Sequence, residues 1–147
     1  MKLLNRTLTF DFGSSNTIVC EDGCVVYDEP TEIAVFNDGR VEVGIKARLF
    51  YSCEYERLRP IVNGQVVNHA AFEAYVNGVL KEIVWFPRIC LNTVVIAVPN
   101  DMNEDDCAAL CEPFRRRGIK DIRIIPKGVA ACLGNNRIVP TKGEQML

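Results

Sequence analysis

The chain has 147 residues, which is enough for one domain or two small lobes with a substantial buried core. Hydrophobic residues make up 48% and charged residues 24%, a balance typical of a soluble globular protein. The net charge of −2 excludes the strongly basic surface of a nucleic-acid-binding protein, and no apolar run approaches the roughly 18 residues of a membrane span.

The first third of the chain has the residue patterns of β-strands and tight turns. We predict strands at residues 6–12, 17–21, 24–28, 31–36 and 40–44. Asp22-Gly23 and Asn37-Asp38-Gly39 are typical of the turns between such strands. A short helix is predicted at residues 45–51, and the polar stretch 54–64 is predicted to be irregular because it contains Pro60 and Asn63-Gly64.

The rest of the chain alternates helix and strand patterns. We predict helices after Asn68, after Asn103 and at residues 127–133, and buried strands at 93–98 and 121–125. Asn68 and Asn103 are suitable N-caps, because a side-chain oxygen at that position accepts from an amide of the first turn. Three antiparallel strands followed by alternating helices and strands indicate an α/β layer.

The cysteines do not have the spacing of a metal site. Seven are present, but no Cys-x-x-Cys occurs and His69 is the only histidine, which argues against zinc. The N-terminal residues lack the apolar stretch of a secretory signal, so we expect reduced thiols, used in packing, in a cytoplasmic protein. The cysteines are Cys20, Cys24, Cys53, Cys90, Cys107, Cys111 and Cys132.

Residues 8–19 form the most informative stretch of the sequence. A β-prone run ends at Asp11, a glycine and small polar residues follow, and a second β-prone run begins at once. An ordinary hairpin has this pattern, and so does a phosphate-binding turn, in which Gly13 lets the backbone approach an anion. Asp11 would then hold a hydrated magnesium ion. The candidate phosphate-binding residues are Gly13, Ser14, Ser15, Asn16 and Thr17.

An ordered series of motifs extends the interpretation of this turn. The first, Asp11-Phe12-Gly13-Ser14-Ser15-Asn16-Thr17, resembles Asp-Leu-Gly-Thr-Ala-Asn-Thr. The others are Asp28-Glu29-Pro30, similar to Asn-Glu-Pro; Val43-Gly44-Ile45-Lys46-Ala47, similar to Val-Gly-x-x-Ala; Arg59-Pro60-Ile61-Val62-Asn63-Gly64, similar to Arg-Pro-Leu-x-x-Gly; and Val95-Ile96-Ala97-Val98-Pro99, similar to Val-Ile-x-Val-Pro. In this order, from about Thr9 to Pro140, they resemble the MreB family of bacterial actins.

The resemblance implies a fold, a division of the chain and a ligand. The fold class is α/β: the first half of the actin-like (ribonuclease H-like) fold, a mixed sheet with flanking helices and a small inserted β lobe. Residues 1–30 and 66–140 would form the core subdomain, 31–65 the inserted lobe and 141–147 a tail. The resemblance also implies ATP and Mg²⁺ at the phosphate loop, bound weakly or only as a vestige.

Two departures from the family pattern argue against a working ATPase. In the family, a strand leads into Glu-Glu-Pro-Met-Ala-Ala-Ala, whose acid positions the attacking water. Here Pro126-Lys127-Gly128-Val129-Ala130-Ala131-Cys132 occupies that place, and neither Pro126 nor Lys127 is a general base at neutral pH. The family's second half, with its second phosphate loop, is not in the sequence. We therefore predict a truncated cytoskeletal cell-shape protein, a filament or scaffold component without autonomous ATPase activity and with no catalytic residue of its own.

Alternatives from other classes stay open. The chain would be the first half of a split or fragmentary actin-like ATPase, or a small ATP-binding regulator of a full-length relative. An expected open sheet face predicts a homodimer, self-assembly or pairing with a full-length MreB-like protein.

The loop that contains Trp85, Phe86, Ile89 and Leu91 has a further interpretation. Its apolar side chains either fold into the core or, as the resemblance implies, touch the inner face of the bacterial membrane. The second interpretation places this cytoplasmic protein peripherally on the membrane.

Overall fold

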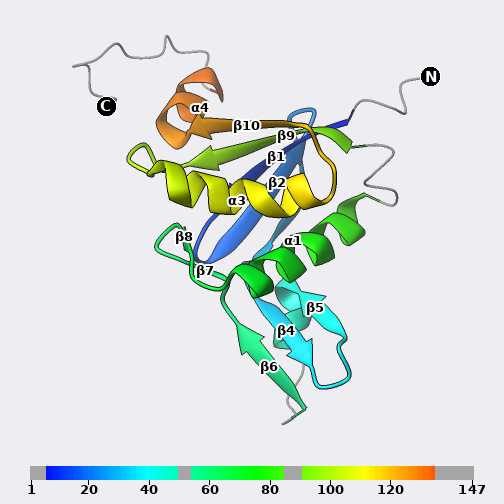
Figure 1. Cartoon of the computed structure of the whole chain (residues 1–147). Coiled ribbons are helices and arrows are strands. Elements are labelled where there is room, and N and C mark those ends of the chain that lie inside the picture. Colours follow the sequence, from blue (N-terminus) through cyan, green and yellow to red (C-terminus); the bar gives the residue numbers. More distant parts are fainter. Residues whose placement is uncertain (1–5, 50–53, 85–90, 135–147) are drawn as a thin grey trace.

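The computed structural model describes residues 6–49, 54–84 and 91–134 (Figure 1). A five-stranded mixed sheet forms its centre, in the order β10-β9-β1-β2-β3. Its strands are β1 (Arg6–Phe12), β2 (Asn16–Glu21), β3 (Cys24–Pro30), β9 (Leu91–Val98) and β10 (Asp121–Pro126). The first three strands form an antiparallel meander, whereas β9 and β10 run parallel to β1. The carboxyl ends of β1, β9 and β10 therefore meet at one edge of the sheet.

Two small sheets lie outside the central one. The first has the order β5-β4-β6 and consists of β4 (Ile33–Phe36), β5 (Val41–Val43) and β6 (Tyr55–Leu58). The second pairs β7 (Ile61–Val62) with β8 (Gln65–Val66), and a 3₁₀ helix, η1 (Gly44–Arg48), follows β5. These elements come from the segment predicted as an inserted lobe, except that β8 ends one residue beyond it.

The longer helices begin where the sequence predicts. They are α1 (His69–Ile83) and α3 (Glu104–Arg116), and a short helix α4 (Lys127–Gly134) follows β10. Asn68 accepts from the amide of Ala71 at 2.9 Å, and Asn103 accepts from that of Asp106 at 2.8 Å, so both predicted N-caps are confirmed. After α3 the chain turns at Gly118, whose φ of +83° suits a glycine beyond a helix end.

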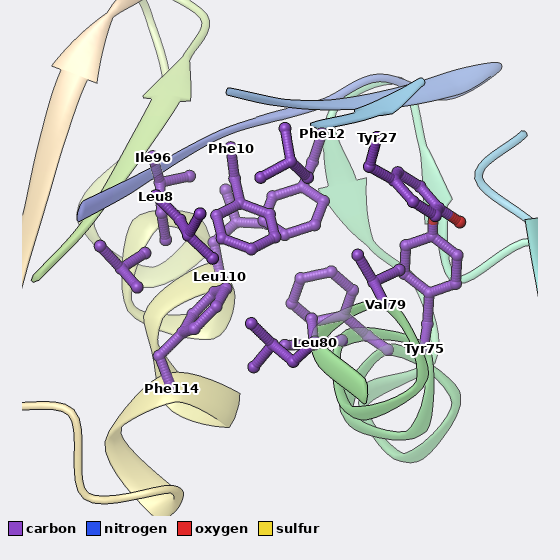
Figure 2. Packing of buried hydrophobic residues seen from close by; sticks show 14 of the residues in the cluster. Leu8, Phe10, Phe12, Tyr27, Tyr75, Val79, Leu80, Ile96, Leu110 and Phe114 are labelled. Atoms are coloured by element: carbon purple, nitrogen blue, oxygen red, sulfur yellow. The ribbon is translucent and has the colours of Figure 1, made fainter. Parts of the chain in front are cut away.

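The main core lies between the central sheet and the face of α1 and α3 (Figure 1). Phe10 of β1 meets Phe114 of α3 with ring centroids 5.0 Å apart, and Phe12 meets Phe72 of α1 at 5.1 Å, both edge to face. Figure 2 shows the rings of β1 filling the space between the two helices, with Tyr27 and Tyr75 facing each other at one side. Because side chains alternate along a strand, Thr9 and Asp11 project from the opposite face.

The prediction of an irregular stretch at residues 54–64 is wrong. The stretch contains β6, which pairs with β4, and β7, which pairs with β8. β6 escapes detection because it is an edge strand with two exposed, charged side chains, Glu56 and Arg57, between half-buried ends. The predicted helix at 45–51 corresponds to the shorter η1.

Candidate functional site

The turn between β1 and β2 is the predicted phosphate loop, and it closes tightly. The amide of Gly13 donates to the carbonyl of Asn16 at 3.0 Å. A Cβ atom on residue 13 would lie 2.6 Å from that carbonyl oxygen, a separation that real Cβ contacts do not reach. The loop therefore requires glycine at this position, for the close approach of its own backbone.

Thr31, just beyond β3, holds this loop in place from behind. Its amide donates to the carbonyl of Ser15 at 2.9 Å, and its hydroxyl donates to the carbonyl of Gly13 at 2.6 Å. The hydroxyl oxygens of Thr31 and Thr17 are 2.9 Å apart. A hydroxyl has one hydrogen, and that of Thr31 goes to Gly13, so Thr17 must donate to Thr31. The role of Thr31 is not predictable from its sequence neighbours, because it depends on contacts with a segment distant in the chain.

The five predicted phosphate-binding residues are thus not equivalent. Thr17 is fully buried and its only hydroxyl hydrogen is used within the protein, so it supports the loop instead of donating to a ligand. Asn16 is exposed, but its side-chain amide donates to Asp28 at 3.1 Å. Ser14 is half-buried and Ser15 is exposed at the tip. The backbone N–H of Gly13 is also used within the loop, so these two serines are the groups best placed to meet an anion.

Lys127 makes an ion pair with Asp11 beside this loop. Asp11, Ala97 and Ile125 are aligned across β1, β9 and β10, and Lys127 follows two residues after Ile125, at the start of α4. Its Nζ atom lies 2.7 Å from Oδ1 of Asp11, and the two side chains are 40% and 42% exposed. The Oδ1 atom itself is buried, and the contact lacks the geometry of a regular hydrogen bond. In the sequence alone, Lys127 is notable only because it stands where the resemblance places the family's acid.

Asn100, at the end of β9, fixes the beginning of the helix that carries Lys127. Its side-chain oxygen accepts from the amide of Gly128 at 3.1 Å. A Cβ on residue 128 would lie 3.0 Å from the nitrogen of the same amide side chain, so glycine permits the close contact. The ends of β9 and β10 are therefore joined where Lys127 projects toward Asp11.

This arrangement does not fit a magnesium ligand at Asp11. Magnesium binds oxygen ligands in a regular octahedron, whereas an ammonium group has only donors to offer. A divalent ion beside the Asp11 carboxylate would lie close to the positive charge of Lys127 and be repelled by it. In the parts of the chain that the structure describes, no three His, Cys, Asp or Glu side chains are grouped to hold a metal ion.

Glu32, the residue after Thr31, is held by two arginines of the segment predicted as the inserted lobe. Its carboxylate is 4% exposed and accepts from Arg48 of η1 at 2.7 and 3.0 Å and from Arg59 at 3.3 Å. The hydrogen bonds from Arg48 hold the pKa of Glu32 below its usual range, although burial acts in the other direction. Nearby, the hydroxyl of Tyr75 donates to the carbonyl of Pro30 at 3.3 Å, and burial raises the pKa of Tyr75.

The predicted membrane or partner loop is only partly covered by the structure. Trp85, Phe86 and Ile89 lie outside the described residues. Leu91 belongs to β9, pairs with Arg6 and is 3% exposed within the main core. A side chain in that position packs under the sheet and is not available to a membrane, so Leu91 is removed from the predicted loop.

Comparisons with known proteins agree with this architecture. A model of the MreB/Mbl protein family matches residues 5–147. A comparison with curated proteins finds no match. Among solved structures, the chain is similar to MreB5 of Spiroplasma citri bound to AMPPNP, with a TM-score of 0.74 and 22% identity, covering 90% of this chain and 41% of that one. For the ADP-bound MreB5, the values are 0.72, 20%, 88% and 40%. The predicted actin-like fold is confirmed, and the chain spans about two fifths of the length of these proteins.

Proposed function

This chain belongs to the MreB/Mbl protein family, and we propose that it is a cytoskeletal protein of cell-shape determination that does not hydrolyse ATP on its own. It would act as a component of a filament or scaffold. The ion pair between Lys127 and Asp11 beside the phosphate loop is the observation that carries the proposed lack of ATP hydrolysis. The family match over residues 5–147 supports the proposed cytoskeletal role.

Hydrolysis requires a group that accepts a proton from, or orients, the attacking water. At the position where the resemblance places the family's acid, this chain has Pro126-Lys127. An ammonium group carries its proton at neutral pH and accepts none, and here it is already held by a carboxylate 2.7 Å away. Neither residue can therefore take the role of the acid.

Nucleotide binding is part of the proposal, in a weak form. The two similar MreB5 structures are bound to AMPPNP and to ADP. In this chain, Ser14 and Ser15 would meet the phosphates, while Thr17, Asn16 and the backbone N–H of Gly13 are engaged within the protein. So few contacts predict a dissociation constant weaker than about 1 mM, which corresponds to about −4 kcal/mol.

Self-association would use the sheet face opposite α1 and α3. On the described strands, Thr9, Ile18, Cys20 and Val95 are only half-buried, although they occupy central positions. A second copy or a full-length relative would cover apolar surface there.

We place the protein in the cytoplasm, and in the described part of the chain no helix has the length and apolarity to cross a membrane. Trp85 and Phe86 would add a weak peripheral contact with the inner face of the bacterial membrane.

Sedimentation velocity and a phosphate-release assay on the purified chain test the proposal. We expect an assembly that grows with protein concentration and persists in salt, because apolar contacts are insensitive to screening. Cys20→Lys should weaken it, whereas Val62→Lys, an exposed apolar position on β7, should not. Phosphate release should stay at the buffer background. A monomer at high concentration contradicts the scaffold role, and release that appears on adding a separately encoded second half supports the split ATPase instead.

A further inference from the structure

Lys127 brings a positive charge to the carboxyl ends of the parallel strands. Without it, the phosphates of a nucleotide would meet the negative charge of Asp11 there. Asp11 is two residues before Gly13, near the end of the strand that leads into the loop that would hold the phosphates. Alone, the Asp11 carboxylate would repel an anion. Lys127 neutralises it at 2.7 Å, and the lysine side chain as a whole remains 40% exposed to solvent.

A lysine can perform the electrostatic task of a metal ion at phosphate. Its ammonium group is a compact point charge with three donors, and a carboxylate uses only part of that capacity. A magnesium ion, in contrast, needs oxygen ligands, and Asp11 is the carboxylate that Lys127 occupies. The two cations therefore compete for the same place.

We propose that Lys127 replaces the divalent metal ion at this edge, so that the chain binds polyphosphate groups as the free anion, without Mg²⁺. The inference rests on the proposed phosphate loop, and it reverses that loop's expected dependence on metal. Asp11 then acts as an internal competitor, because an incoming phosphate must share or displace its contact with Lys127. A nucleoside triphosphate and inorganic tripolyphosphate offer the same chemistry.

The direction in which Asp11→Asn changes the phosphate affinity distinguishes a metal-binding site from a site in which Lys127 takes the place of the metal. Where Asp11 binds a metal ion, Asp11→Asn removes a ligand and weakens phosphate binding. Where Asp11 competes for Lys127, the same substitution releases the ammonium and strengthens binding several-fold. Lys127→Gln removes the charge and should weaken binding about tenfold, the size expected for one charge-assisted hydrogen bond. Lys120→Gln is the matched control, because Lys120 is exposed and precedes the opposite end of β10.

The experiment is a titration of the ¹⁵N-labelled chain, followed by the amide signals of Ser14 and Ser15. ATP and tripolyphosphate are each added in EDTA and in excess Mg²⁺, which distinguishes a nucleotide from its phosphates alone. We expect binding in EDTA to be at least as tight as in Mg²⁺, and Lys120→Gln to change it less than twofold. Mn²⁺ alone should broaden these amides in Lys127→Glu but not in the wild type.

The proposal is overturned by binding that needs Mg²⁺, by weaker binding in Asp11→Asn, or by loop amides that do not move with either anion up to about 10 mM, a concentration at which a site with a dissociation constant of a few millimolar is mostly occupied. The wild-type titrations and Asp11→Asn decide the question even if Lys127→Gln fails to fold. Assembly and phosphate release are measured separately, so the scaffold function can fail while metal-independent binding holds, and the reverse.

Discussion

The hydroxyl oxygens of Thr17 and Thr31 lie 2.9 Å apart in the interior, and the Thr31 hydroxyl donates a hydrogen bond to the carbonyl of Gly13. Thr31→Val keeps the shape of the side chain but leaves that carbonyl and Thr17 without this partner. We expect a loss of about 1–3 kcal/mol in the free energy of unfolding, measured in urea, because buried polar groups lose their hydrogen bonds. Thr7→Val, at an exposed position of β1, should change stability by less than about 0.5 kcal/mol. Equal effects of the two substitutions would show that Thr31 does not brace the loop.

The contact of Glu32 with Arg48 predicts a pH dependence of stability. The arginine lowers the pKa of Glu32 in the folded state, so its contribution is present above the unfolded value of about 4.3 and is lost as the pH falls through the folded value. We expect Glu32→Gln to cost about 2 kcal/mol at pH 7, since a buried charge-assisted hydrogen bond is lost. The difference from wild type should shrink below about pH 4. Glu56→Gln, on exposed β6, is the control; a difference that does not vary with pH would contradict the role of the Glu32 charge.

Gly78 lies in the middle of α1, where alanine is normally the better residue by about 1 kcal/mol. Here a Cβ would lie 2.5 Å from Cγ1 of Val43 in β5, so we expect Gly78→Ala to destabilise the protein by about 1–2 kcal/mol through overpacking. Val43→Ala should remove most of that penalty, measured as a coupling free energy in a double-mutant cycle. Gly134→Ala meets no atom within 4 Å and should not destabilise the protein. Additive effects of the two core substitutions would argue against the contact.

Local patterns were sufficient for the helices and most strands, because their signals come from neighbouring residues. Asn68 and Asn103 cap helices through amides three positions away, and the sequence contains both partners. Contacts between distant segments were not predictable in this way. Thr31 reaches the loop from the end of β3, and Lys127 reaches Asp11 only after the parallel strands have aligned. The sequence left open whether Leu91 folds into the core or touches a membrane, since nothing local indicated that β9 begins there.

Phe86 and Leu91 should respond differently to serine. Leu91 is 3% exposed in the core, so Leu91→Ser should cost several kcal/mol of stability in urea unfolding. If Phe86 belongs to a loop that touches the membrane, Phe86→Ser should change stability by less than about 0.5 kcal/mol and abolish binding to anionic lipid vesicles. A large loss of stability in Phe86→Ser would identify Phe86 as a core residue and defeat the membrane proposal.

The position of β1 has a consequence for how the chain is made. β1 is central in the sheet, yet its parallel partner β9 is synthesised only after the two small sheets and α1. Until Ile96 can pair with Phe10, the nascent meander leaves the outer edge of β1 unpaired, and Phe10 lacks its contact with Phe114 of α3, which follows β9 in the chain. Contacts so distant in sequence form slowly, and such exposed edges favour aggregation. Folding on the ribosome should therefore be rate-limited by the pairing of β1 with β9, and this is the stage at which a chaperone would act.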